Sequence, residues 1–155
     1  MPKKVKPIPN GYHTATPYLI VDDGARAIEF YERAFGAVEV MRMPAPGGKV
    51  GHAEIKIGDS HIMLADEAPE MDARSPKHYG GSPVSLMLYV EDVDKLFAQA
   101  VAAGGTVARP VADMFYGDRS GTVKDPFGHS WHLSTHKEDV PPDEMKKRMD
   151  AMHKG

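Results

Sequence analysis

Short runs of alternating apolar and polar residues are separated by amphipathic segments with helical spacing. Residues 16–21 are β-branched and aromatic and end at two aspartates, which predicts a strand that runs into a helix start. Over residues 25–35 apolar side chains recur every three or four positions, and Gly36 follows as a stop signal. Further strands are predicted over residues 37–43, 51–57 and 61–65, with turns at Gly47-Gly48 and Gly58-Asp59. The pattern is that of one βαβββ unit.

The same pattern begins again at Ser85. A strand over residues 85–90 precedes a helical segment, which ends before Gly104-Gly105. When residues 16–37 are laid over residues 85–106 without a gap, the matched pairs are Leu19 and Leu88, Val21 and Val90, Asp23 and Asp92, and Arg26 and Lys95. Later strands are predicted over residues 107–114, 121–124 and 131–135, with turns at residues 116–118 and 125–128. The chain therefore contains an internal repeat of the βαβββ unit.

A chain of 155 residues is long enough for one domain with a proper core. We expect a single α+β domain over residues 12–137. It consists of two units, 12–68 and 82–137, joined by a linker over 69–81. A flexible N-terminal tail over residues 1–11 precedes the domain, and a C-terminal helical tail over 138–155 follows it. The linker lacks periodicity. The methionines of the tail, Met145, Met149 and Met152, are expected to pack on the domain in preference to a second subunit.

The composition narrows the classes of partner. A formal net charge of −3 gives no field that attracts a nucleic acid backbone. The chain contains no cysteine, so thiolate chemistry and disulfides are excluded. The N-terminus lacks the apolar stretch of a signal peptide, and no run approaches the length of a membrane span. We expect a soluble, cytoplasmic protein that binds neither nucleic acid nor membrane.

Two stretches, Thr16 to Tyr31 and Tyr116 to Trp131, carry a resemblance to a known family. Over about residues 12–137 the chain resembles the vicinal oxygen chelate superfamily of glyoxalases, extradiol dioxygenases and bleomycin-resistance proteins, and its PhnB-like branch in particular. The resemblance implies a cupped mixed sheet formed by both units, with helices on the convex side. It also implies a homodimer with a small-molecule site in each cup.

Alternation along the strands sorts the side chains of each unit into two faces. One face is apolar, with Leu19 and Val21 in the first unit and Trp131 and Leu133 in the second, and we assign it to the core beneath the helices. The opposite face mixes aromatic, methionine, hydroxyl and imidazole side chains, which is typical of a small-molecule site. From this face we take as ligand-binding candidates Thr16, Tyr18, Glu54, Met63, Ser85, Met87, Tyr89 and His132. The alternative is that this face packs against another layer or a dimer partner.

Metal-dependent members of the superfamily place one metal ligand on the first strand and one on the last strand of each unit, which gives four ligand positions. By resemblance, the corresponding positions here are Thr16, Met63, Ser85 and His132. Three of these four are not ordinary ligands of a divalent ion, so we expect no metal cofactor. One alternative remains open, in which one divalent metal ion binds at displaced positions, namely His52, Glu54 and His132. In the other interpretation, His52 and Glu54 are the polar side of a half-solvated strand.

Two candidates, His132 and Arg119, each have two interpretations. His132 is either an acid or base near neutral pH or a neutral hydrogen-bonding wall residue. Arg119, in the segment that begins at Tyr116, either holds an anionic ligand or braces the loop through Asp118 or Asp125. Tyr116 and Arg119 complete the set of ligand-binding candidates. No phosphate-loop, Gly-x-Ser-x-Gly or His-Glu-x-x-His motif is present.

These observations lead to three functional hypotheses. The first is a metal-free protein that binds a small, partly aromatic or anionic metabolite or antibiotic. The second is a metal-dependent lyase, isomerase or dioxygenase that uses the displaced site. The third is a structural or regulatory homodimer whose cup is filled by its own side chains.

Overall fold

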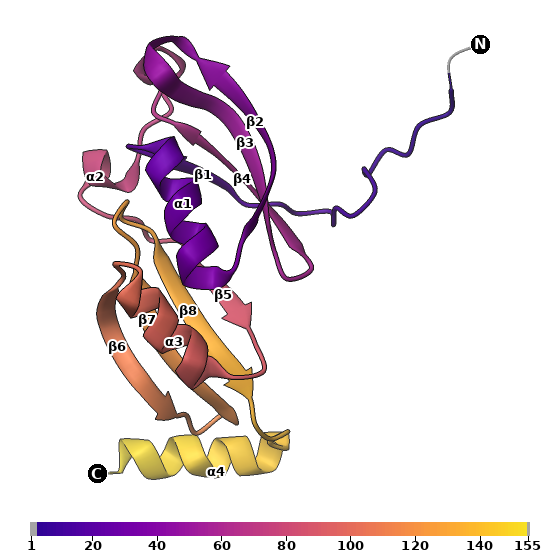
Figure 1. Ribbon diagram of the computed structural model, residues 1–155. Helices are drawn as coiled ribbons and strands as arrows, with labels where there is room; N and C mark the ends of the chain where they lie inside the picture. The colour runs from indigo at the N-terminus through magenta and orange to yellow at the C-terminus, as the bar shows by residue number, and fades with distance from the viewer. Residues whose placement is uncertain (1–2, 155) are drawn as a thin grey trace. The chain divides into compact units, whose positions relative to one another are not determined.

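The computed structural model describes residues 3–154, which form two compact units divided between Gly81 and Ser82 (Figure 1). The elements of the first unit are β1 (Tyr18–Val21), α1 (Gly24–Phe35), β2 (Val38–Ala45), the 3-10 turn η1 (Pro46–Gly48), β3 (Lys49–Ile57), β4 (Ser60–Asp66), the 3-10 turn η2 (Pro69–Met71) and α2 (Pro76–Tyr79). Those of the second are β5 (Ser85–Tyr89), α3 (Val93–Ala102), β6 (Thr106–Asp113), β7 (Asp118–Lys124), β8 (Ser130–His136) and α4 (Pro142–His153).

Each unit builds its own four-stranded mixed sheet. The strand order is β1-β4-β3-β2 in the first unit and β5-β8-β7-β6 in the second. The first and last strands of each unit pair in parallel, and the remaining pairs are antiparallel. The predicted α+β class and the repeat of the βαβββ unit are therefore confirmed.

Both long helices begin in the same way, as the repeat predicts. The carboxylate of Asp23 accepts a hydrogen bond from the backbone N–H of Arg26 at 3.1 Å, and Asp92 accepts from Lys95 at the same distance. An aspartate in this position satisfies one of the unpaired N–H groups at a helix start. α1 ends at Phe35 and is capped by Gly36, whose φ of 70° is readily available only to glycine.

The apolar face of each sheet lies under its helix. In the first unit Leu19, Val21 and Leu64 are buried together with Ile28 and Tyr31 of α1. The side chains that form this face in the second unit are Val123, Trp131 and Leu133, all fully buried, and Leu86 and Leu88, which are half-buried. We call the opposite side of each sheet its open face.

The predicted linker over residues 69–81 contains short helical turns, which its lack of periodicity did not indicate. It forms η2 and α2, and Ala68 pairs with Ala73 through an isolated bridge. Proline begins both helical turns, where its missing N–H leaves no helical hydrogen bond unmade. Short turns of this kind carry little periodicity, and sequence patterns miss them.

The ends of the chain differ partly from expectation. α4 is present as predicted, but Met149 and Met152 are 43% and 59% exposed, so packing of these two methionines on the domain is wrong. Arg148 instead holds the helix through hydrogen bonds to the carbonyl oxygen of Phe115 and to Glu138. In the predicted tail 1–11, residues 1–2 lie outside the described part, as does residue 155, and residues 3–11 form neither helix nor strand. No helix among residues 3–154 has the length and apolar character needed to cross a bilayer.

Candidate functional site

One row of side chains crosses the open face of each unit. In the first unit Tyr18 of β1 pairs with Met63 of β4, and Met63 pairs with Glu54 of β3. Glu54 and Met63 are therefore direct neighbours on this face. The corresponding row of the second unit consists of Met87, His132 and Thr122. Strand register thus brings together candidates that lie far apart in the sequence.

A chain of polar contacts runs along the open face of the first unit. The hydroxyl of Tyr12 donates a hydrogen bond to Glu54, and the hydroxyl of Tyr18 lies 2.8 Å from Nδ1 of His52. Nε2 of His52 is 3.9 Å from Oε2 of Glu54, so the four side chains form one network. Tyr12 precedes the strands and belongs to no periodic pattern, so its role was not apparent from the sequence.

Both tyrosines of this network stay protonated at neutral pH. Burial and the hydrogen bond to Glu54 raise the pKa of Tyr12 to about 12. Burial, and then the charge of Glu54, also raise the pKa of Tyr18. Removing water disfavours a phenolate, and a neighbouring carboxylate disfavours it further. The network therefore offers hydroxyl donors and aromatic surface, and no anionic oxygen from tyrosine.

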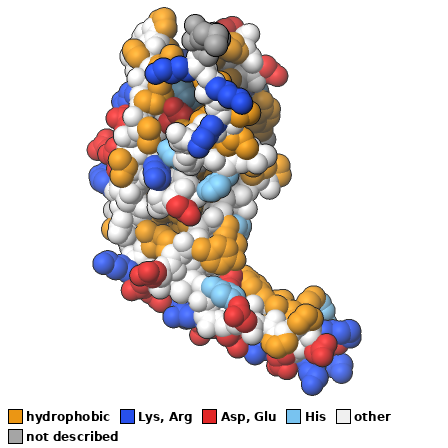
Figure 2. All heavy atoms as spheres, turned by 90° about the vertical axis from the view of Figure 1, so that its right-hand side faces the viewer, with side chains coloured by type: hydrophobic (Ala, Val, Ile, Leu, Met, Phe, Trp, Pro, Cys, Tyr) orange, Lys and Arg blue, Asp and Glu red, His pale blue; other side chains and the backbone are white. Residues whose placement is uncertain are grey.

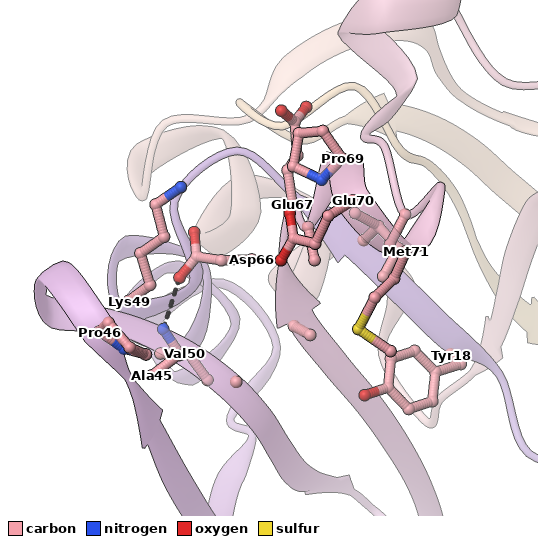
Figure 3. A pocket seen from close by; sticks show the side chains of 15 residues that line it. Tyr18, Ala45, Pro46, Lys49, Val50, Asp66, Glu67, Pro69, Glu70 and Met71 are labelled. Carbon is pink, nitrogen blue, oxygen red and sulfur yellow. Dashed lines mark hydrogen bonds between the residues drawn. The ribbon is translucent and has the colours of Figure 1, made fainter.

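A pocket of about 570 Å³ lies at the end of this open face (Figure 3). Tyr18 and Ile20 of the edge strand β1 and Ala65 of β4 contribute to it, so it is continuous with the network through Tyr18. Its remaining walls come from the β2–β3 turn and from the segment after β4, and include Lys49, Asp66, Glu67, Glu70 and Met71. The volume lies within the usual range for small-molecule sites.

Hydrogen bonds to carboxylates hold the walls of this pocket. Asp66 accepts from the backbone N–H groups of Gly24 and Val50, at 2.9 and 2.7 Å, and so ties β4 to the start of α1 and to β3. Glu67 accepts from both the backbone N–H and the hydroxyl of Ser75, which is fully buried. Sequence reasoning missed this wall because it assigned residues 69–81 to a linker.

The open face of the second unit is lined with hydroxyl groups. Nδ1 of His132 lies 2.7 Å from Oγ1 of Thr122, and Nε2 lies 2.9 Å from Oγ of Ser85. Both ring nitrogens thus have hydroxyl partners, which is the arrangement of a hydrogen-bonding wall residue. On the same face Arg109 donates to Ser120, a contact with no sequence signal because β6 is irregular in register.

A second polar chain begins at Tyr89, another predicted site residue. Its hydroxyl donates to Oδ2 of the buried Asp118 at 3.0 Å. The other oxygen of Asp118 lies 2.7 Å from Nδ1 of His136, and Nε2 of His136 lies 2.7 Å from Asp139. Asp118 is the first residue of β7, which starts three residues before the predicted Gly121.

We expect His136 to make the stability of the second unit depend on pH. Hydrogen bonds to Asp139 and to Asp118 raise the pKa of His136 above its ordinary value of 6.5. When the pKa of a group is higher in the folded state than in the unfolded state, its charged form stabilises the fold. This stabilisation is complete at pH values below the unfolded-state pKa, and it is lost as the pH rises through the folded-state pKa. The difference in melting temperature between the wild type and His136→Gln should therefore be larger at about pH 5.5 than at about pH 8.5. Parallel pH profiles of the two proteins would contradict this assignment.

Arg119 lies on the helix-covered face, away from His132. Its guanidinium makes two hydrogen bonds to Asp94 of α3, at 2.9 and 3.0 Å, and a third to Asp113. Alternation along β7 decides this, since Gly121, two residues on, faces Phe97 of α3. Arg119 therefore braces β7 against α3, but the predicted partners Asp118 and Asp125 are wrong. Tyr116 lies in the β6–β7 connection, edge-on to Phe115.

The four positions that carry metal ligands in metal-dependent relatives do not suit a divalent ion here. Thr16, Met63 and Ser85 offer two hydroxyls and a thioether, and only His132 is an ordinary ligand. Within either unit of the described chain, no three histidine, aspartate or glutamate side chains form a group that could hold an ion. The displaced alternative draws His52 and Glu54 from the first unit and His132 from the second.

Comparison with known proteins identifies the family. An uncharacterised protein of Mycobacterium bovis, Mb0911c, is 43% identical over 143 residues, which cover 90% of this chain and 94% of that protein. The X-ray structure of an Arabidopsis thaliana gene product is 27% identical, with a TM-score of 0.65, and the match covers 79% of this chain and 98% of that one. The PhnB protein of Bacillus cereus shares the fold at 21% identity, with a TM-score of 0.61 and coverage of 79% and 99%.

The family model matches residues 12–133, which cover the first βαβββ unit and the second as far as Leu133 in β8. The expected resemblance to the vicinal oxygen chelate proteins is thereby confirmed. This chain belongs to the Glyoxalase/Bleomycin resistance protein/Dioxygenase superfamily.

Proposed function

We propose that this protein binds a small organic molecule on the open faces of its sheets, without a metal at the four family positions. The pocket beside Tyr18 is the observation that carries the proposal. It joins apolar and aromatic surface to a hydroxyl whose neighbour, His52, fixes its direction at 2.8 Å. Adaptable apolar contact together with a few directional polar groups is the usual composition of a small-molecule site.

The chemistry of the strand positions supports binding over metal-assisted catalysis. A divalent ion needs imidazole nitrogen or carboxylate oxygen to replace its water ligands. Among Thr16, Met63, Ser85 and His132, only His132 supplies such an atom, and it lies among hydroxyl partners. These positions therefore favour ligand binding over a reaction at a bound metal.

A metal-dependent lyase, isomerase or dioxygenase remains the second candidate because of one distance. His52 and Glu54 approach within 3.9 Å on the same open face, and they would supply one imidazole and one carboxylate. In this structure each is already engaged, Glu54 by Tyr12 and His52 by Tyr18. Metal binding would require these hydrogen bonds to be exchanged.

Elemental analysis and a ligand screen on one preparation test the two candidates together. Protein purified without chelator is expected to carry far less than about one metal ion per chain, because the family positions lack ligands. In a thermal-shift screen of small aromatic molecules, hits should stabilise the wild type and lose most of their effect in Tyr18→Ala.

The control for metal is Glu54→Ala, which removes the only carboxylate of the displaced site. About one Zn, Mn, Fe or Ni per chain in the wild type, lost in Glu54→Ala, would make metal-assisted chemistry the leading candidate. Hits that stabilise Tyr18→Ala as strongly as the wild type would place binding outside the pocket.

A further inference from the structure

The pocket of the first unit is lined by more acidic than basic side chains. Asp66, Glu67 and Glu70 line it, against the single cation Lys49. We infer that this pocket selects an organic cation, a molecule with an apolar or aromatic body and an ammonium or related group. The inference rests on the proposed function and names the class of ligand. It replaces the anionic ligand that the sequence left open.

The three carboxylates differ in what they can still bind. Both oxygens of Asp66 already accept backbone N–H groups. Glu67 uses Oε1 for both hydrogen bonds from Ser75, and these bonds lower its pKa, so it remains ionised at neutral pH. Among residues 3–154 no side chain forms an ion pair with Glu70. Glu70 and the second oxygen of Glu67 are therefore the acceptors available to a bound cation.

The apolar surface lies next to these acceptors. Glu70 is adjacent in sequence to Met71, and Figure 3 shows Met71 and Tyr18 together at one end of the pocket. In the same view Lys49 lies at the other end, beside Asp66. The face of a tyrosine ring attracts a cation, and a thioether adapts to the shape of an apolar body. A cation bound over Tyr18 therefore lies at the end of the pocket away from Lys49.

Three probes that share a phenylethyl body separate charge from shape. They are phenethylammonium, 2-phenylethanol and 3-phenylpropanoate, titrated into the full chain with isotope-labelled methionine methyl groups. Met71→Leu assigns the Met71 signal, which reports binding in the pocket. We expect phenethylammonium to bind about threefold to tenfold more tightly than the alcohol, and the carboxylate to bind most weakly. The preference should shrink as salt is added.

Charge-changing variants locate the effect. Glu70→Gln should lower the affinity for phenethylammonium about threefold and leave the affinity for 2-phenylethanol unchanged. Lys49→Gln should raise the affinity for phenethylammonium by a similar factor. Glu29→Gln is the matched control, because Glu29 is exposed on α1 and outside the pocket. If Glu29→Gln and Glu70→Gln lose the same affinity for phenethylammonium, the loss comes from the change in net charge and not from a contact in the pocket. That result would overturn the inference.

The outcomes separate the inference from the proposed function. Equal affinities for the three probes, or tightest binding of 3-phenylpropanoate, overturn the cation preference and leave small-molecule binding in place. If none of the probes shifts the Met71 signal while the protein remains folded, the pocket does not bind small aromatic molecules. Both the inference and the proposed use of this pocket then fall.

Discussion

Replacing Asp125 by alanine is expected to lower the free energy of unfolding by about 3 to 5 kcal/mol, because three buried donors lose their acceptor. Oδ1 accepts from the backbone N–H groups of Phe127 and His129, both at 2.9 Å. Oδ2 accepts from the indole N–H of Trp131, also at 2.9 Å. Asp125 and Trp131 are both buried, so water does not readily replace the carboxylate.

Urea denaturation of Asp125→Ala and Asp125→Asn measures the loss. Asparagine keeps one oxygen acceptor, so it should cost about half as much as alanine. Glu29→Ala serves as the surface control and should change stability by less than about 0.5 kcal/mol. A loss below about 1 kcal/mol in Asp125→Ala would mean that the three donors find other partners.

This carboxylate matters for the site because the turn it closes precedes β8. β8 carries His132 and Ser134 on the open face and Trp131 and Leu133 on the helix-covered face. Since side chains alternate, a displaced start of β8 would disturb both faces together. The sequence suggested only a turn at residues 125–128, and the structure adds that Asp125 is its buried acceptor.

Replacing Glu67 by alanine should release the wall of the first unit's pocket, at a cost of about 2 to 3 kcal/mol. Ser75 is fully buried, and both its N–H and its hydroxyl bond to Glu67. The alanine variant leaves these two donors without an acceptor. The segment from Pro69 to Ala73, which lines the pocket, lies between these two residues and should become mobile.

Hydrogen exchange at the Ser75 amide, followed by NMR, measures this release. Exchange should accelerate strongly in Glu67→Ala and less in Glu67→Gln, which retains an oxygen acceptor. Unchanged protection of the Ser75 amide in Glu67→Ala would refute the role assigned to this contact.

The same contact predicts a dependence on acid pH. Hydrogen bonds from Ser75 lower the pKa of Glu67 below its ordinary value of 4.5. When the pKa of a carboxyl group is lower in the folded state, its ionised form stabilises the fold. This stabilisation is present at pH values above the unfolded-state pKa, and it is lost as the pH falls through the folded-state pKa. Protection of the Ser75 amide should therefore decrease below about pH 4 in the wild type, and Glu67→Gln should lack this decrease.

The repeat, the fold class and the two faces of each sheet could all be predicted from the amino-acid sequence. These follow from local rules, because period-two alternation assigns faces and aspartate and glycine mark helix ends. The burial of Leu19, Val21 and Leu64 and the pairing of Glu54 with Met63 agree with those rules. The unsuitability of Thr16, Met63 and Ser85 as metal ligands also needs only their side-chain chemistry.

The contacts between polar side chains, in contrast, depend on the three-dimensional fold. The partners Tyr12 and Glu54 are 42 residues apart, and Arg119 and Asp94 are 25 apart, and no periodicity encodes such pairs. The pocket wall depends on Glu67 reaching the buried Ser75 across a segment without a repeating pattern. Register and alternation specify the face on which a side chain lies, whereas distances between side chains depend on how the loops fold back. For this reason the open face was predictable, and the pocket with its excess of carboxylates was not.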